Sequence, residues 1–310
     1  MTDAATSAPA LPPADAPAGP RGRARSARLS LLGQYAGFLP ALALFGAFFA
    51  LPLGLIVAYS FWETIDYNVV HHWSLDNYRY FFSVSTYIST MWATIWVSVA
   101  ATAITIGVAF PFTYWLVRYV PRRLQRLLLV FVILPFWTSY LLRVYSWLNI
   151  LGDGGAINRF LQWAHFTDHP LSFFLYDRPA VILVLIYLYF PFAVLTLYAS
   201  LERFDWDQFK AAMDLGARPR TAITRILLPQ IRPGITTAVI FVFIPILGEY
   251  LAPQLVGGAQ GVMIGNLIVN FFTGAQYTRG AAAALLIAAL IVVLLAIFRR
   301  SLEVEDAYRA

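Results

Sequence analysis

The sequence has no cysteine and little charge. The absence of cysteine excludes a disulfide framework and any metal or catalytic site built on thiolates. Only 12% of the 310 residues are charged and 60% are hydrophobic, whereas soluble domains carry about a quarter charged residues. This composition predicts an all-α integral membrane protein that crosses the bilayer several times. We attribute the net charge of +6 to membrane topology and expect no nucleic-acid binding.

The two ends of the chain differ in composition from the rest. The first twenty residues contain five prolines and seven alanines, and four arginines follow between residues 21 and 28. We expect residues 1–30 to be a disordered cytosolic tail, residues 31–303 to form the membrane domain, and residues 304–310 to form a second cytosolic tail. A cleaved signal peptide is disfavoured, because the first apolar run is too long and begins too far from the start.

Six apolar runs are long enough to cross a bilayer as helices, which requires about 20 residues. We predict these spans at Phe38–Phe61, Met91–Val117, Leu127–Leu151, Ala180–Leu201, Thr236–Val256 and Ala281–Phe298. Prolines within five of them predict bent helices around a cavity: Pro40, Pro52, Pro111, Pro135, Pro191, Pro245 and Pro253.

The basic residues predict the orientation of the spans. The N-terminal tail, the 118–126 turn, the 203–232 loop and the C-terminal tail hold 4, 4, 6 and 3 of the 22 lysines and arginines. The remaining 5 are spread over the other three loops and the third span. We therefore expect both termini and the 203–232 loop to lie in the cytoplasm. On the opposite side, Ser74 is a plausible N-cap for a short interfacial helix over residues 74–82.

The 203–232 loop has the pattern of two short helices joined by a sharp turn. The apolar residues Phe209, Ala212 and Met213 share one helical face, and Gly216 follows where a left-handed residue would end that helix. Pro219 suits the first turn of a second helix, whose apolar face repeats at Ile223, Ile226 and Leu227 and which we expect Pro229 to end. Amphipathicity alone is equally consistent with a segment lying on the membrane surface.

The spacing within this loop resembles the EAA loop of ABC-importer permeases. The residues that carry the resemblance are Lys210, Ala211, Ala212, Asp214, Gly216, Ile226, Leu228 and Pro229. The resemblance implies that the loop docks into a groove on a separate cytosolic ATPase, present in two copies, which would bind ATP and Mg²⁺. This chain has no G-x-x-x-x-G-K-[ST] sequence and needs no cofactor of its own, so we expect it not to be an enzyme.

One position departs from that family pattern. Lys210 is the only lysine in the chain and stands where the family has glutamate. If the family's glutamate contacts the ATPase, that contact must be altered here, or be made by Asp207 or Asp214.

Two further segments resemble the first membrane subunit of spermidine/putrescine-type ABC importers. They are residues 134–147, LPFWTSYLLRVYSW, and residues 247–258, LGEYLAPQLVGG, the second followed by IGNLI at 264–268. The resemblance implies the type I importer fold in a bacterial inner membrane, a homologous second permease and an extracytoplasmic solute-binding protein. Related branches carry ferric iron, thiamine, phosphonates or sulfate, and these solutes remain alternatives to a polyamine.

The translocation path is predicted from one carboxylate within an apolar span and the aromatic residues near it. A charge at that depth costs on the order of 2.5–3.5 kcal/mol, so it usually faces a cavity or a partner. Glu249 would attract a cationic solute, or it would pair with Arg143 or a backbone group and fix helix geometry. We favour a structural role for Arg143 itself. The other predicted path residues offer aromatic faces to a cation: Trp137, Tyr140, Tyr145 and Tyr250.

Two other classes of protein fit less well. An ion-coupled secondary transporter often shows repeated halves, and no internal repeat is visible here. A metal-dependent membrane enzyme could use His165 and His169 with Asp168, but Pro170 follows directly and no acidic set surrounds them, so we expect a solvated loop and no metal site.

Overall fold

The computed structural model describes residues 38–65, 68–167, 169 and 175–303. The predicted tails at 1–30 and 304–310 lie outside these residues. The chain divides into two units, residues 1–55 and 56–310, and each is described by itself.

The described part of the first unit is one apolar helical run. It consists of α2 (Leu39–Phe45), a π-helical turn η1 (Gly46–Ala50) and the beginning of α3 (Leu51–Phe61), which continues into the second unit. The wide turn directly precedes Pro52, whose ring cannot fit a regular helical turn. The run Pro40–Phe61 is long and apolar enough to cross a membrane, as predicted.

The second unit begins with the end of α3 and a short β-hairpin. Strands β1 (Glu63–Ile65) and β2 (Asn68–Val70) pair antiparallel, with Thr64 opposite Val69. Helix α4 (Asp76–Ser83) follows, and the Ser74 hydroxyl accepts a hydrogen bond from the Asp76 amide at 2.9 Å. Leu75 occupies the N-cap position of α4, so the predicted N-cap Ser74 lies one residue before it.

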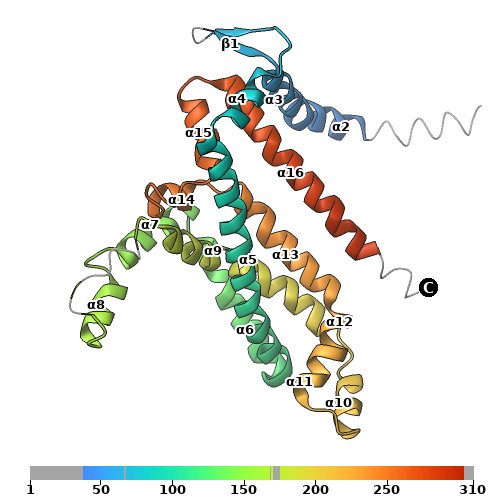
Figure 1. Cartoon of the computed structure of the whole chain (residues 1–310). Coiled ribbons are helices and arrows are strands. Elements are labelled where there is room, and N and C mark those ends of the chain that lie inside the picture. The colour runs from blue at the N-terminus through green and yellow to red at the C-terminus, as the bar shows by residue number, and fades with distance from the viewer. Residues whose placement is uncertain (1–37, 66–67, 168, 170–174, 304–310) are drawn as a thin grey trace, which may run out of the picture. The chain divides into compact units, whose positions relative to one another are not determined.

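Three long helices form the centre of the second unit. Helices α5 (Ser85–Tyr119), α9 (Arg178–Glu202) and α13 (Arg232–Leu247) pack against one another, as Figure 1 shows for α5 and α9. Their contacts are made largely by alanine, valine and leucine side chains that are almost completely buried. Gly234 lies so close to Ser200 that a Cβ atom there would overlap it, which lets α13 approach α9 closely. Pro111 and Pro191 lie inside continuous helices.

The third predicted span is broken and does not cross the membrane as one helix. Helix α6 (Arg122–Ile133) leads into a 3₁₀ turn η2 (Leu134–Trp137), and α7 (Tyr140–Leu151) and α8 (Ala156–Trp163) follow. The two halves meet at 93°. The break begins at Pro135, which cannot continue the α-helical hydrogen bonds, and Thr138 and Ser139 that follow are extended. The predicted span Leu127–Leu151 is therefore divided between two helices, and the break lies at Pro135, one of the prolines from which bent helices were predicted.

The fifth predicted span is also interrupted. A helical run over Pro219–Gln230 bends by 70° into α13, which ends at Leu247. Residues 248–250 form a break before α14 (Leu251–Val256). The predicted span Thr236–Val256 is thus divided between two helices, and the break lies between Pro245 and Pro253, two of the prolines from which bent helices were predicted. Helix α15 (Ile264–Thr273) lies between the fifth and sixth predicted spans.

The last predicted span is confirmed within α16 (Tyr277–Glu303). Within the described residues, four helices are long and apolar enough to cross a membrane, or up to six if each bent pair counts as one span. The fold is therefore that of a helical membrane protein with several spans, two of them bent.

Candidate functional site

The first candidate site is the polar hairpin between α9 and α13. Helix α10 (Trp206–Asp214) begins with Asp205, whose carboxylate accepts the Asp207 amide at 3.0 Å. It ends at Gly216, which has a φ of +87°. The Gly216 amide donates to the Met213 carbonyl at 2.9 Å and the Ala217 amide donates to the Ala212 carbonyl at 3.0 Å. This pair of bonds is the Schellman helix ending, so the predicted glycine turn is confirmed.

The second half of the hairpin begins at Pro219 as predicted but does not end at Pro229. Helix α11 (Pro219–Ala222) continues through a π-helical turn η4 (Ile223–Leu227) into α12 (Leu228–Gln230). A proline ring clashes with the carbonyl four residues earlier in a regular helix. The wide turn just before Pro229 relieves that clash, and the helical run instead ends at Gln230.

A buried apolar cluster fixes the hairpin to the membrane helices. Phe209 of α10 and Leu227 of η4 are at most 2% exposed, and they pack with Leu201, Phe204, Ala222 and Ile231. Gln230 donates to Gln208 at 2.7 Å and so joins the two halves. The hairpin is therefore a packed unit that can transmit force to α9 and α13.

A contact that the sequence did not reveal attaches the hairpin to α5. The Arg118 guanidinium lies 5.3 Å from the ring centre of Trp206 and 6.0 Å from that of Phe209. Trp206 also meets the ring of Tyr114 at 6.0 Å. This contact could not be predicted, because nothing local in the sequence links Arg118 to Trp206, which lies 88 positions later.

The outer surface of the hairpin exposes both polar and apolar side chains. Ala211, Asp214 and Pro229 are exposed, whereas Ile226 and Leu228 are partly buried. Leu215, beside Gly216, is 91% exposed, which the sequence analysis did not single out. An apolar side chain this exposed at the tip is suited to entering a groove on another protein.

The unusual lysine is paired within its own helix. Lys210 donates to the Asp207 carboxylate at 2.7 Å, and both side chains are exposed. This hydrogen bond and the lysine charge hold the pKa of Asp207 below its usual value. Lys210 therefore presents a partly neutralised charge to anything that binds the hairpin.

The second candidate site surrounds Glu249 in the break between α13 and α14. One carboxylate oxygen accepts the amides of Tyr250, Leu251 and Ala252, at 3.1, 2.9 and 3.4 Å. This oxygen caps the beginning of α14, where a helix has unpaired amide groups. The Glu249 side chain is thus held by the backbone, one of the two arrangements expected from the sequence.

The other carboxylate oxygen joins three elements. It accepts the hydroxyl of Tyr140 from α7 at 2.5 Å and that of Tyr189 from α9 at 3.2 Å. Glu249 is buried, at 8% exposure, and Asn266 of α15 donates to the Tyr250 carbonyl at 2.7 Å. Glu249, Tyr140 and Tyr189 are called the carboxylate node below. Tyr189 and Asn266 were missed because no local pattern separates them from other residues of apolar helices.

The remaining predicted path residues are arranged differently. Among the described residues Arg143 makes no ion pair, and its guanidinium instead lies over the rings of Phe136 and Tyr140, at 4.7 and 5.5 Å. Trp137, Tyr145 and Tyr250 are 81%, 46% and 43% exposed. The structure thus brings Tyr140, Arg143 and Glu249 together and leaves the three exposed rings outside the carboxylate node.

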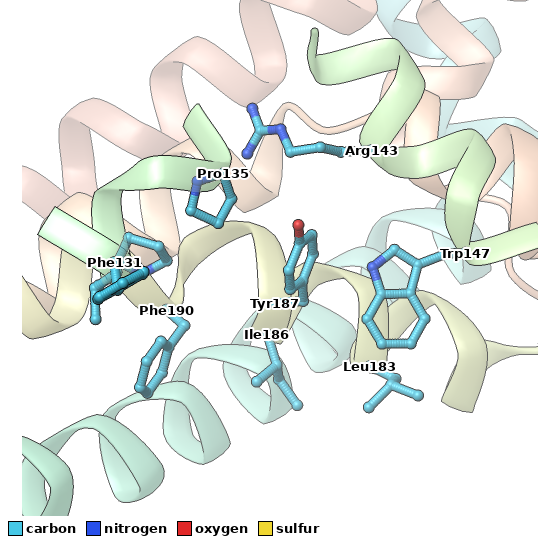
Figure 2. A pocket seen from close by; sticks show the side chains of 10 residues that line it. Phe131, Pro135, Arg143, Trp147, Leu183, Ile186, Tyr187 and Phe190 are labelled. Atoms are coloured by element: carbon cyan, nitrogen blue, oxygen red, sulfur yellow. The ribbon is translucent and has the colours of Figure 1, made fainter. Parts of the chain in front are cut away.

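A cavity of about 360 Å³ opens beside this region (Figure 2). Figure 2 shows Arg143 above the Tyr187 hydroxyl, with Leu183, Ile186 and Phe190 from the same helix as Tyr187 lower in the view. A second cavity of about 300 Å³ shares Arg143, Trp147 and Tyr187 with the first. The site combines an apolar wall with one cation, and it contains no acidic lining residue.

The alternative histidine site is not assembled by the described residues. His165 lies in the turn after α8 with a φ of +57°, and Asp168 and Pro170 lie outside the described residues. No group of three metal-ligating side chains occurs in the part of the chain that the structure covers.

Several apolar helices, with two bent pairs among them, and a packed hairpin between α9 and α13 define a helical membrane protein. The chain belongs to the family of binding-protein-dependent transport system inner membrane components, whose model matches residues 35–304. It is 32% identical to the spermidine/putrescine transport system permease protein PotB of Escherichia coli over 256 residues, 82% of this chain and 92% of that protein.

Other relatives and solved structures agree with this family. The inner membrane ABC transporter permease protein YdcU of Escherichia coli is 32% identical over 251 residues, 76% of this chain and 79% of that protein. A chain of a bacterial alginate ABC transporter, solved with an alginate-bound periplasmic protein, matches with a TM-score of 0.73 at 19% identity. That match covers 90% of this chain and 97% of the other, and at this identity it supports the fold alone.

Proposed function

We propose that this chain is the membrane-spanning subunit of an ABC importer that carries a polyamine of the putrescine or spermidine type into the cell. The observation that carries the proposal is the hairpin over 203–232, which has the EAA-like spacing, a Schellman ending at Gly216 and an exposed Leu215 at its tip. The similarity to PotB along most of both chains supports the polyamine as solute.

The proposed assembly places four kinds of subunit together. Two copies of a cytosolic ATPase bind ATP and Mg²⁺ and receive the coupling hairpins, and a homologous second permease completes the path. An extracytoplasmic binding protein delivers the solute. Both termini of this chain lie in the cytoplasm, because most lysines and arginines fall in the segments that would share that side.

The proposed mechanism is alternating access. When the ATPases close on ATP, the hairpin moves with them and carries α9 and α13 through its buried cluster. The bent spans then change the opening of the path. Hydrolysis and release of the nucleotide return the permease to its inward-facing state.

The hairpin can be tested at its glycine. At Gly216, with a φ of +87°, alanine adopts a strained backbone and proline cannot adopt the required φ. Gly107→Ala is a matched control, because Gly107 lies inside α5 with open space around its Cβ position. In cells lacking this subunit, wild type and Gly107→Ala should restore uptake of labelled putrescine and spermidine, and an equally abundant Gly216→Pro protein should not.

Two results would contradict the proposal in different ways. If deletion of this subunit leaves polyamine uptake unchanged in cells with no second polyamine system, a polyamine is not the solute that this permease carries. Normal uptake with Gly216→Pro at normal abundance would exclude coupling through this hairpin.

A further inference from the structure

We propose that Arg143 forms an intersubunit ion pair with a carboxylate on a membrane span of the second permease, which enters the cavity of Figure 2. This inference rests on the proposed function, because it requires a second permease.

The Arg143 guanidinium has no ion-pair partner among the described residues. The Nε atom is buried without a hydrogen-bond partner in the described part of the chain, whereas the side chain as a whole is partly exposed, so its terminal nitrogens are the donors open to a partner. A guanidinium carries five N–H donors, and stacking on Phe136 and Tyr140 satisfies none of them. An unpaired cation at membrane depth is unfavourable, and such residues are usually paired with an acid.

Within this chain the nearby acid is already occupied. Both oxygens of Glu249 are used, one by three backbone amides and one by Tyr140 and Tyr189. No ion pair joins Glu249 to Arg143 among the described residues. The missing acid therefore comes from another molecule.

The depth of the cavity favours a protein side chain over a lipid phosphate. Tyr187, which lines the cavity with Arg143, lies nine residues after Arg178, where α9 begins. At 1.5 Å per residue this is about 14 Å along the helix. Arg178 follows the polar Asp177 and donates to the Gln260 carbonyl, which marks that end of α9 as polar. A phosphate remains at headgroup level, whereas a helix can present a carboxylate at any depth.

The surroundings favour a different subunit over the solute or a second copy of this chain. A polyamine carries positive charge and would be repelled by Arg143. A second copy of this chain would offer no free acid at this depth, because the only carboxylate within its predicted spans is Glu249, whose two oxygens are already used. The apolar side chains around the break are largely exposed, with Phe131 at 58% and Leu142 at 63%, so they can pack against a partner helix. A carboxylate matches the planar donor fork of arginine best.

The experiment measures assembly and not transport. The tagged chain is purified in mild detergent from its native host, and the second permease recovered with it is quantified by mass spectrometry. Arg143→Gln should lower that recovery about tenfold or more, because the partner carboxylate is left unpaired. Arg143→Lys should retain part of the recovery of the second permease, because lysine keeps the positive charge but lacks the planar donor fork of arginine. Arg159→Gln, at an exposed position on α8, is the matched control and should behave as wild type.

A second measurement protects against misfolding of the variant. The chain has no cysteine, so a single cysteine at the exposed Leu142 should cross-link to a cysteine on the second permease. In an Arg143→Glu background, replacing one acidic span residue of the second permease by arginine should restore recovery. The position that restores it identifies the partner carboxylate.

Each contrary result overturns the inference. If Arg143→Gln does not lower the recovery of the second permease, the proposed ion pair is excluded. If Arg143→Gln instead removes a bound phospholipid, the group that Arg143 binds is a lipid phosphate. The proposed ion pair is also excluded if the wild-type complex contains two copies of this chain, or if Leu142→Cys forms no cross-link to the second permease. Polyamine uptake measured in the same strains shows separately whether the proposed function stands.

Discussion

The carboxylate node gives a prediction with a clear order of effects. Tyr140→Phe removes the 2.5 Å hydrogen bond to Glu249, and bonds to charged groups contribute about 1.5–3 kcal/mol. Tyr189→Phe removes a longer bond of 3.2 Å, for which about 0.5–1.5 kcal/mol is expected. Glu249→Ala should cost about 3 kcal/mol or more, because two hydroxyls and three amides lose their acceptor. Tyr145→Phe, on the same helix as Tyr140 but 46% exposed, is the control.

Glu249→Gln separates a structural role from contact with the solute. Its amide oxygen can still cap α14, and its amide nitrogen can donate to the tyrosine hydroxyls, so we expect a loss of only about 1–2 kcal/mol. The purified importer is assayed by thermal unfolding, and uptake is measured over a range of solute concentrations. If Glu249 only positions helices, stability and maximal uptake should fall together while the KM changes little.

Two outcomes would refute this reasoning. A Glu249→Gln protein with normal thermal stability and a strongly raised KM would place the carboxylate against the solute. A Tyr145→Phe protein as unstable as Tyr140→Phe would show that the node does not carry the stability assigned to it.

Two further predictions concern the coupling hairpin. Phe209→Ala removes a side chain that is 2% exposed and should cost about 3–5 kcal/mol, so the recovery of the ATPase with the purified permease should fall. Val108→Ala, on α5 outside the hairpin and 51% exposed, is the control and should leave that recovery nearly normal. Equal recovery with both variants would show that the buried cluster does not hold the hairpin. Lys210→Gln should leave thermal stability unchanged at pH 7, because its pair with Asp207 is exposed, but should change the salt dependence of ATPase binding. The Lys210–Asp207 pair should persist at neutral pH and be lost only as the pH falls through the pKa of Asp207, which is lowered from its ordinary 3.8. If Lys210→Gln binds the ATPase with the same salt dependence as wild type, Lys210 is not part of the contact.

The class of protein and the local form of the hairpin could be predicted from the amino-acid sequence alone. Composition and the length of apolar runs are sufficient for the first, because the bilayer imposes both. Gly216 and Pro219 were placed correctly because a left-handed residue and a missing amide are local requirements. Pro229 was misjudged, since its effect depended on how the preceding turn widened.

The prolines predicted bent spans, but the folded structure was needed to show that the chain breaks at Pro135 and not at Pro111 or Pro191, and to show what the buried polar groups contact. Glu249 meets Tyr189 and Tyr140, which lie 60 and 109 residues away in the chain, and Trp206 meets Arg118. A hydropathy pattern records that a segment is apolar, but not whether it is straight or which side chain faces it. The carboxylate of Glu249 can hold α7, α9 and α14 together only because folding brings their donors within hydrogen-bond distance of two oxygen atoms.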